Sequence, residues 1–357
     1  MQSKSMKPEI SIENLVRPNI RKLEPYRSAR DDYESGLLLD ANENSLGAPY
    51  QQADGLHRYP SPYQQKLRGK IAGLRDLEPE NVFVGVGSDE AIDLLYRIFC
   101  EPRTDNIIIT PPTYGMYKVS AGIHDVAVKK VNLDPNFQPK VDEILDAADE
   151  HSKMLFLCSP NNPTGNEFEQ ERIEALVSEF PGIVVIDEAY IDFSDRKSRA
   201  ELIKTHPNLV VLQTLSKSFG MAGIRMGIAL ASEIIIKFML KVKAPYNVNA
   251  LTSKYALEAF DHLDTISFHI DKLVEEREML RNKLQEVPGV RKIYPSNANF
   301  LLVKFDDAVK TYKELAKKEI IVRYRGNEPL CENCLRITVG TPDENEKLIN
   351  TLKELAE

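Results

Sequence analysis

Cysteine and histidine are scarce in this sequence, which has four cysteines and six histidines among 357 residues. Four cysteines are too few to form a disulfide scaffold in a chain of this length. Cys331 and Cys334 form a C-x-x-C motif, but a zinc site needs a second pair of ligands, and no histidine cluster lies near it in the sequence. We therefore expect no metal site and interpret both cysteines as unpaired residues of a loop that enters a strand.

Long apolar runs and a basic net charge are also absent. No run reaches the roughly 18–20 residues that span a bilayer, and the first seven residues lack the apolar core of a signal peptide. The formal net charge of -8 disfavours nonspecific binding to nucleic acid or to anionic membranes. We expect a cytoplasmic protein that binds neither nucleic acid nor membrane.

Between about residue 80 and residue 230, short apolar segments alternate with segments of helical periodicity, such as 88–99 and 168–180. This alternation is typical of an α/β domain whose mainly parallel sheet is covered by helices on both faces. The sequence predicts strands at 81–84, 106–110, 126–131, 154–158, 183–187, 209–213 and 226–230.

The pattern changes after residue 250. One or two long helices are expected over 250–286, where Pro288 and Gly289 end them. The rest predicts an α+β unit, and the length suffices for two domains. We expect an N-terminal arm at 1–34, a large domain at 35–262 and a small C-terminal domain at 263–357. In the small domain the sequence predicts strands at 299–304, 320–323 and 335–339, and helices at 308–318 and 343–356.

One lysine has neighbours that suggest chemistry. Lys217 lies between Ser216 and Ser218, close to Gly220 and eight residues before Arg225. An amine can form a Schiff base with a carbonyl compound, and an arginine with nearby hydroxyl groups can hold a phosphate. Pyridoxal 5′-phosphate (PLP) carries an aldehyde and a phosphate on one small ring, so this segment favours a PLP site.

Two motifs follow expected strands, at the sheet edge where ligands bind in open α/β folds. The segment 159–165 reads SPNNPTG, a rigid turn in which Asn161 and Asn162 supply amide groups, although an ordinary turn would look similar. Asp187 ends a buried strand, where a carboxylate needs a partner such as a protonated pyridine nitrogen. Tyr190 could donate to a ring oxygen, and the alternative for Asp187 is a helix cap.

Two further loops follow strands and have plain structural alternatives. Gly87, Ser88 and Asp89 join a strand to a helix, whose free amides favour a phosphate, although acidic residues in a first turn also suit a helix that binds nothing. Tyr114 could lie flat on a cofactor ring or pack in the core.

Two arginines occur among apolar strand residues. Arg323 ends the expected strand 320–323, and Arg336 lies near the start of the strand 335–339. A guanidinium in such a place needs an anion, which can be a ligand carboxylate or phosphate, or a carboxylate of the protein itself.

In this order the motifs resemble the fold-type I PLP-dependent aminotransferases of class II, and most closely the histidinol-phosphate aminotransferases. The resemblance extends from NLVRPNI at 14–20 and LEPY at 23–26, through LDANEN at 39–44 and RYP at 58–60, to CLRITVGT at 334–341. It implies an α/β large domain with a mainly parallel seven-stranded sheet between helices, a smaller α+β domain, PLP as cofactor, and a homodimer with shared active sites.

The resemblance also implies roles for matching residues. The catalytic residues would be Lys217, as the Schiff-base lysine and proton shuttle, with Asp187 and Tyr190. The Asn162–Pro163 bond would be cis. The cofactor would be held by Gly87, Ser88, Asp89, Tyr114, Asn162, Asp187, Tyr190, Ser216, Lys217 and Arg225, and by Tyr59 of a second subunit. The substrate would be bound by Tyr26, Asn42, Glu43, Arg323 and Arg336.

The implied reaction transfers an amino group between L-histidinol phosphate and 2-oxoglutarate, in histidine biosynthesis. A second arginine suits a dianionic phosphate better than a carboxylate, which modestly favours a phosphorylated substrate. An aromatic amino acid aminotransferase and a PLP-dependent decarboxylase of a phosphorylated amino acid remain alternatives, because their cofactor motifs would be nearly the same. A noncatalytic PLP-binding sensor is disfavoured by the acidic charge and by the short segment before the aminotransferase-like body.

Overall fold

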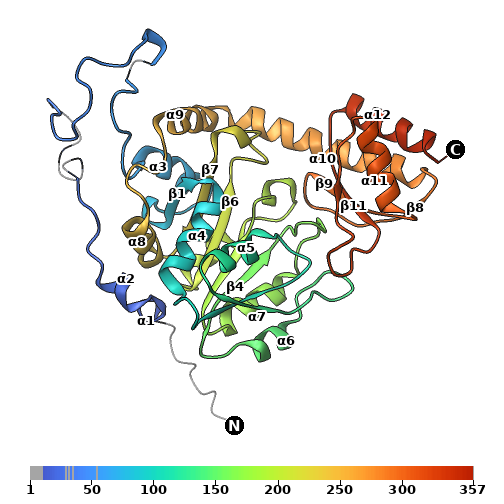
Figure 1. Ribbon diagram of the computed structural model, residues 1–357, viewed down its shortest axis with the longest axis horizontal. Coiled ribbons are helices and arrows are strands. Elements are labelled where there is room, and N and C mark those ends of the chain that lie inside the picture. The colour runs from blue at the N-terminus through green and yellow to red at the C-terminus, as the bar shows by residue number, and fades with distance from the viewer. Residues whose placement is uncertain (1–10, 29, 31–32, 34–35, 54, 357) are drawn as a thin grey trace.

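The computed structural model describes residues 11–28, 30, 33, 36–53 and 55–356. The first seven residues, from which we excluded a signal peptide, and the expected boundary between residues 34 and 35 lie outside the described residues. The chain forms two sheets with their helices, and an N-terminal segment runs along the side of the larger part that faces away from the C-terminal part (Figure 1).

The larger part contains a seven-stranded sheet in the order β1-β7-β6-β5-β4-β2-β3. All seven predicted strands are confirmed, and so is the mainly parallel arrangement, because only β7 runs antiparallel to its neighbours β1 and β6. The strands are β1 (Val82–Val86), β2 (Asn106–Ile109), β3 (Ala127–Lys130), β4 (Ser152–Cys158), β5 (Ile183–Asp187), β6 (Leu209–Thr214) and β7 (Met226–Ala231).

Helices cover both faces of this sheet because both faces of its central strands are apolar. In β5, Val184 and Ile186 pack into one core cluster, while Ile183 and Val185 pack into another on the opposite face. This alternation follows from the two-residue period of a strand. The helices of this part are α3 (Gln65–Leu74), α4 (Gly87–Phe99), α5 (Met116–Ile123), α6 (Val141–Ala147), α7 (Gln170–Glu179), α8 (Glu233–Val242) and α9 (Ala250–Ala259).

The smaller part contains an antiparallel four-stranded sheet in the order β10-β11-β9-β8. Helices α10, α11 and α12 pack on it around a separate core cluster. The bounds are α10 (Leu263–Gln285), β8 (Val290–Ile293), β9 (Phe300–Phe305), α11 (Ala308–Lys317), β10 (Arg323–Tyr324), β11 (Cys334–Thr338) and α12 (Pro342–Glu354).

Two local predictions for the smaller part need correction. The expected strand 320–323 is wrong, because β10 begins at Arg323 and ends at Tyr324. The residues before it lie in the connection that follows α11, where the amide of Ile320 donates back to the carbonyl of Leu315 at 2.9 Å. Strand β8 was not predicted, because its polar and charged residues at an exposed edge carry no apolar alternation.

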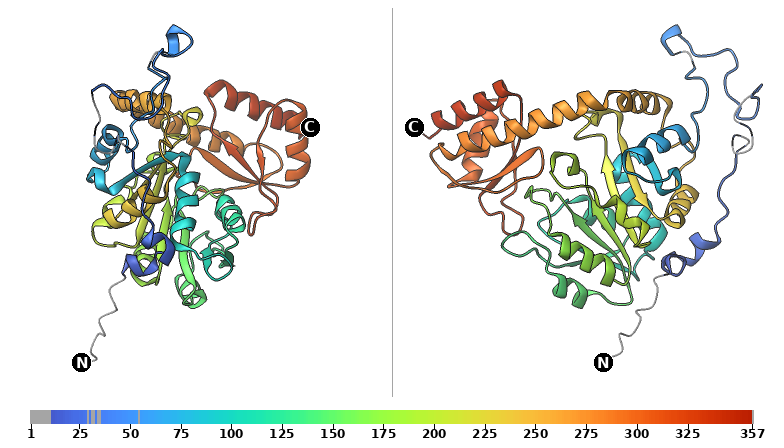
Figure 2. Two further views of the ribbon diagram at one scale, coloured as in Figure 1. Left: turned by 60° about the vertical axis from the view of Figure 1, so that its left-hand side comes forward. Right: turned by 180° about the vertical axis from the view of Figure 1, so that it is seen from behind.

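Helix α10 connects the two parts along one side of the molecule (Figure 2). The helical stretch predicted for 250–286 is present as α9 and α10, separated by a short 3-10 turn at Phe260–His262. The domain boundary that we predicted at 262/263 coincides with the first residue of α10, and the division into domains stays a prediction.

The N-terminal segment begins with α1 (Ile12–Leu15) and α2 (Pro18–Lys22), which contact α8. Beyond them the chain runs outward from the body (Figure 2), and it exposes Leu37, Leu39 and Leu46 to more than 70% of their full accessible area. Among the described residues, no helix is both long and apolar enough to cross a membrane.

Candidate active site

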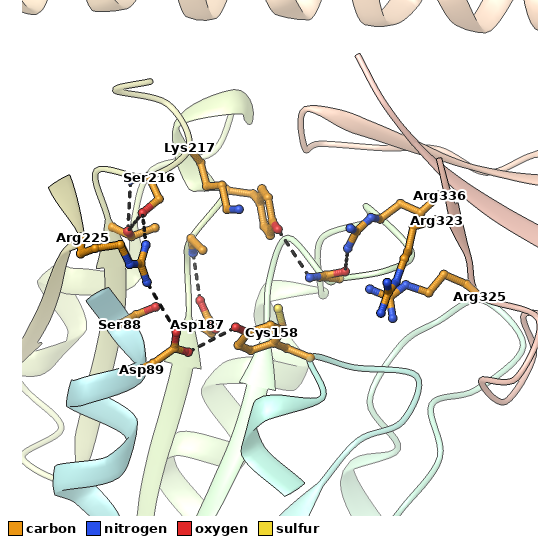
Figure 3. A pocket seen from close by; sticks show the side chains of 15 residues that line it. Ser88, Asp89, Cys158, Asp187, Ser216, Lys217, Arg225, Arg323, Arg325 and Arg336 are labelled. Atoms are coloured by element: carbon orange, nitrogen blue, oxygen red, sulfur yellow. Dashed lines mark hydrogen bonds and ion pairs between the residues drawn. The ribbon is translucent and has the colours of Figure 1, made fainter. Parts of the chain in front are cut away.

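One cavity of about 370 Å³ collects most of the residues predicted from the sequence. It lies at the carboxyl ends of β4, β5 and β6, and β10 and β11 of the smaller part close its other side (Figure 3). Its lining consists of Ser88, Asp89, Tyr114, Cys158, Asn162, Asp187, Ala189, Tyr190, Thr214, Ser216, Lys217, Arg225, Arg323, Arg325 and Arg336.

One end of the cavity is built for an anion. Helix α4 begins there, so the free amides of its first turn and the positive end of its dipole face the cavity. The guanidinium of Arg225 lies 3.4 Å from the hydroxyl of Ser216 and 3.7 Å from a carboxylate oxygen of Asp89. Ser88 lines the same end (Figure 3). A cation, hydroxyls and helix amides together are groups that can hold a phosphate.

Two glycines allow this end to form. Gly87 has φ +74°, a left-handed conformation that side-chain-bearing residues rarely adopt, and a Cβ there would lie 2.7 Å from Nη2 of Arg225. A Cβ on Gly227 would lie 2.0 Å from the backbone carbon of Gly87. Strand β7 therefore reaches the start of α4 only because both positions lack side chains.

Asp187 lies in the middle of the cavity as a buried carboxylate, 3% exposed. It accepts hydrogen bonds from the Tyr117 hydroxyl at 2.7 Å and from the Ala189 amide at 3.1 Å. The described part of the chain places no cation within ion-pair distance of it. Burial raises the pKa of Asp187, against the two hydrogen bonds, so a cationic partner would favour its charged form.

Asn162 and Tyr190 lie beside each other above this carboxylate. Nδ2 of Asn162 is 3.5 Å from the Tyr190 hydroxyl, and the Asn162–Pro163 bond is cis as predicted. Asn161, by contrast, points away from the ligand space, because its amide donates to the carbonyl of Pro112 at 2.9 Å and to Thr164. Only the second asparagine of the pair is thus available to a ligand.

Lys217 projects into the cavity between its two cationic ends (Figure 3). Its Nζ lies 5.6 Å from the centre of the Tyr190 ring and makes no hydrogen bond or ion pair with any residue that the structure describes. Burial, followed by the charge of Arg336, lowers the pKa of Lys217 from its ordinary value. A less basic amine is a better nucleophile and proton acceptor at neutral pH.

The opposite end of the cavity carries three arginines. Arg336 donates from Nη1 to Oδ1 of Asn162 at 2.6 Å and lies 5.3 Å from the centre of the Phe300 ring. Arg323 pairs directly with Arg336 across β10 and β11, so the two side chains leave the sheet on the same face. Arg325 also lines this end (Figure 3).

Five predicted residues are not part of the cavity lining: Gly87 lies beside it at the start of α4, and four others line different pockets. Asn42, Glu43 and Tyr59 line a different pocket, where Glu43 forms ion pairs with Arg30 at 2.9 Å and Arg58 at 2.6 Å. Tyr59 is half exposed and stacks on Tyr246, with 4.7 Å between ring centres. Tyr26 is also largely exposed and lines a third pocket. Within one chain, the structure does not bring these four residues to Lys217.

Several residues in or beside the cavity had no role predicted from the sequence. Tyr117 lies outside the lining, although its hydroxyl donates to Asp187, and Cys158, Ala189 and Thr214 line the cavity. Arg325 could have been found from its two-residue spacing to Arg323, had the strand been placed correctly.

From the sequence we expected that the C-x-x-C motif binds no metal and lies in a loop that enters a strand. Cys331 and Cys334 are both free and fully buried, and Cys334 begins β11, as expected for a loop that enters a strand. No group of three or more metal-ligating side chains exists in the part of the chain that the structure describes.

The residues fit PLP on the features of the site itself. The buried carboxylate of Asp187 suits the ring nitrogen and the amine of Lys217 suits the aldehyde, since neither forms an ion pair with a described residue, and the helix start with Arg225 suits the phosphate. Tyr114 lies across the same space, held by a hydrogen bond from its hydroxyl to Asp89 at 3.2 Å. The second cationic end, beyond Asn162, is then left for the anionic group of a substrate.

Comparison with known proteins agrees with this geometry. Residues 34–352 match the family model for aminotransferase class I and II. The histidinol-phosphate aminotransferase of Flavobacterium psychrophilum is 49% identical over 97% of this chain and 99% of its own length.

Two solved structures share the fold. The histidinol-phosphate aminotransferase from Clostridium acetobutylicum superimposes with a TM-score of 0.78 at 24% identity, covering 84% of this chain and 91% of its own. The corresponding enzyme from Sinorhizobium meliloti, in complex with pyridoxal-5′-phosphate, gives a TM-score of 0.77 at 22% identity, covering 88% and 89%. The chain belongs to the aminotransferase class I and II family.

Proposed function

We propose that this protein is a PLP-dependent transaminase that exchanges an amino group between L-histidinol phosphate and 2-oxoglutarate, in histidine biosynthesis. In the biosynthetic direction, glutamate supplies the amine to 3-(imidazol-4-yl)-2-oxopropyl phosphate. The observation that carries the proposal is the position of Lys217 between two cationic ends of one cavity, with no ion pair to any residue that the structure describes. The near full-length similarity to a histidinol-phosphate aminotransferase supports the choice of substrate.

The residues of the cavity would hold PLP at several points. Asp187 would pair with the ring nitrogen, Asn162 and Tyr190 would bind the ring oxygen, and Tyr114 would contact the ring face. The phosphate would be held by the α4 start and by Ser88, Ser216 and Arg225. When bound, PLP supplies an aldehyde that condenses with amines and a ring that accepts electrons from the substrate carbon.

Lys217 would perform the proton transfer. Its amine would hold the cofactor through the aldehyde that PLP supplies, until the amine of a substrate takes that place. Nζ, whose pKa is lowered, would then accept the proton from the substrate carbon that carries the amine and hold it for return. The carboxylate of Asp187 would stabilise a positive charge on the ring nitrogen.

Two different anions must use the arginine end in turn, the phosphate of histidinol phosphate and a carboxylate of glutamate. Arg336 can bind either, because a planar guanidinium fork matches both groups. Its hydrogen bond to Asn162 couples the anion site to the residue that would contact the cofactor. Substrate binding and cofactor position would therefore be linked.

We also propose that the active protein is a homodimer with shared sites. The exposed positions of Tyr26 and Tyr59, and the outward course of the segment that carries Asn42 and Glu43, support a role for them in a second subunit. Mixing a Lys217→Ala variant with a Tyr59→Ala variant under exchange conditions should restore activity that neither has alone. Absence of recovery in verified mixed dimers would contradict shared sites.

The division at 262/263 and the cytoplasmic location stay predictions.

A half-reaction screen tests the proposed function. The PLP-loaded protein is mixed with histidinol phosphate, phenylalanine, tyrosine or glutamate, and the visible spectrum of the cofactor reports amine transfer. We expect histidinol phosphate and glutamate to bleach the spectrum fastest. Fast transfer from phenylalanine or tyrosine alone would select an aromatic aminotransferase, and release of carbon dioxide without a keto acid would select a decarboxylase.

A further inference from the structure

A third arginine at the substrate end has no role in the family resemblance. Arg325 is two residues after Arg323, so both side chains leave the chain on one face, opposite to Tyr324. Tyr324 and its cross-strand partner Leu335 pack in the core of the smaller part, which fixes the direction of the arginines. Arg323, Arg325 and Arg336 consequently face the same cavity (Figure 3).

Arg325 forms no ion pair at contact distance with any residue that the structure describes. Its Nε is buried without a hydrogen-bond partner, and its guanidinium forms no ion pair. The two acidic residues that line the cavity are Asp89 and Asp187. They lie on the side of Arg225 and away from the other three arginines (Figure 3). Burial, and then the charges of Arg336 and Arg323, lower the pKa of Arg325, while the charge of Glu328 opposes them less strongly. A half-buried cation beside two other cations is costly unless an anion joins them.

The backbone around Arg325 is firmly anchored. Its amide donates to the carbonyl of Cys334 at 2.9 Å, which extends the pairing of β10 with β11 by one residue. Its carbonyl accepts from the amide of Glu328 at 3.0 Å, and the loop continues to Cys331, whose side chain is fully buried. The C-x-x-C cysteines therefore serve as apolar anchors of the loop that carries Arg325. Because its backbone is fixed before a ligand binds, Arg325 loses less conformational freedom on binding than an arginine on a flexible loop would.

The two amino donors, glutamate and histidinol phosphate, place their anionic groups at different distances from the carbon that carries the amine. In an α-amino acid the carboxyl carbon is bonded directly to the carbon that carries the amine. In histidinol phosphate a methylene and an ester oxygen intervene, so the phosphate reaches deeper and carries close to two charges. Arg336 lies next to Asn162 and can meet either group, whereas the Nε of Arg325 has no hydrogen-bond partner among the described residues.

We propose that Arg325 is a specificity-determining residue that binds the phosphate of the amino donor and favours a phosphate monoester over a carboxylate. This rests on the proposed function, because it assigns a residue to the substrate of that same cavity. Arg336 then serves both substrates, and Arg325 acts mainly on the phosphorylated one.

The test compares half-reactions of three amino donors: histidinol phosphate, histidinol and glutamate. In Arg325→Gln, kcat/KM for histidinol phosphate should fall by about ten- to a hundredfold, as expected for the loss of a hydrogen bond to a charged group. The values for histidinol and glutamate should stay unchanged. Arg291→Gln is the matched control, because it removes one arginine whose exposed ion pair with Asp306 lies outside the cavity.

A binding measurement gives a readout apart from turnover. Calorimetric titration of the PLP-loaded protein with inorganic phosphate should show weaker binding to Arg325→Gln than to the wild type and to Arg291→Gln. Arg325→Lys keeps a charge without the planar fork, so it should lose less preference for histidinol phosphate than Arg325→Gln does. If Arg325→Gln fails to fold, a drop in that preference in Arg325→Lys supports the inference, and an unchanged preference overturns it.

Other outcomes separate this inference from the proposed function. An inactive wild type with histidinol phosphate removes the proposed function and the inference with it. An active wild type whose preference for histidinol phosphate is unchanged in Arg325→Gln overturns only the inference. A selective loss of glutamate activity would assign Arg325 to a carboxylate and also overturn it.

Discussion

Replacing Tyr117 with phenylalanine removes the hydroxyl that donates to Asp187 at 2.7 Å and leaves the ring in place. The lost interaction is a buried hydrogen bond to a carboxylate, which contributes about 1.5–3 kcal/mol. Burial already raises the pKa of Asp187, and loss of the donor should raise it further. The carboxylate must be ionised to hold a protonated ring nitrogen, so the loss should appear mainly in cofactor binding.

The expected result is a PLP dissociation constant that rises by about ten- to a hundredfold in Tyr117→Phe, measured by equilibrium dialysis of the apoprotein near pH 7. Tyr96→Phe is the control, because Tyr96 is also fully buried and its hydroxyl donates at 2.6 Å, but to the carbonyl of Tyr117 and not to Asp187. It should lower thermal stability without changing PLP affinity. Equal losses of affinity in both variants, or none in Tyr117→Phe, would refute the reasoning.

Three further predictions concern the lysine and the phosphate end. Lys217→Ala should lower transamination by at least about a thousandfold in single-turnover assays, and retained turnover would exclude the covalent mechanism. The rate at which the apoprotein incorporates PLP should rise with pH and level off at a pH below the ordinary pKa of lysine, because burial and Arg336 lower the pKa of Lys217. In Arg336→Gln the rise of this rate with pH should occur at higher pH, because the variant lacks the positive charge that disfavours protonation of Lys217. A shift of this rise to lower pH would contradict the prediction. Gly87→Ala should cost about 1–2 kcal/mol of stability in denaturant unfolding, because φ is +74°, and should weaken PLP binding by displacing Arg225. Gly289→Ala, at φ +85° with its nearest neighbour 3.8 Å away, should show a similar backbone cost but unchanged PLP binding.

The site could be predicted from sequence where one short segment carries the whole signal. Lys217, Ser216 and Arg225 lie within ten residues, and Asp187 ends a strand whose apolar character is visible in the sequence. The structure places all of them in one cavity, because parallel strands end at the same edge of a sheet. The prediction was weaker for Arg323, because the apolar residues before it, which we expected to form a strand, lie in the connection between α11 and β10.

The sequence by itself determined the alternation of strands and helices and the kinds of side chain that follow each strand, because these depend on local periodicity and spacing. Only the tertiary structure decided which of those side chains meet. Tyr117 reaches Asp187 across 70 positions, and Arg336 reaches Asn162 across 174. Such contacts depend on strand order and on the register of β10 with β11, which also directs Arg325 into the cavity. Register is set by which faces are buried against the rest of the fold, and no short segment contains that information.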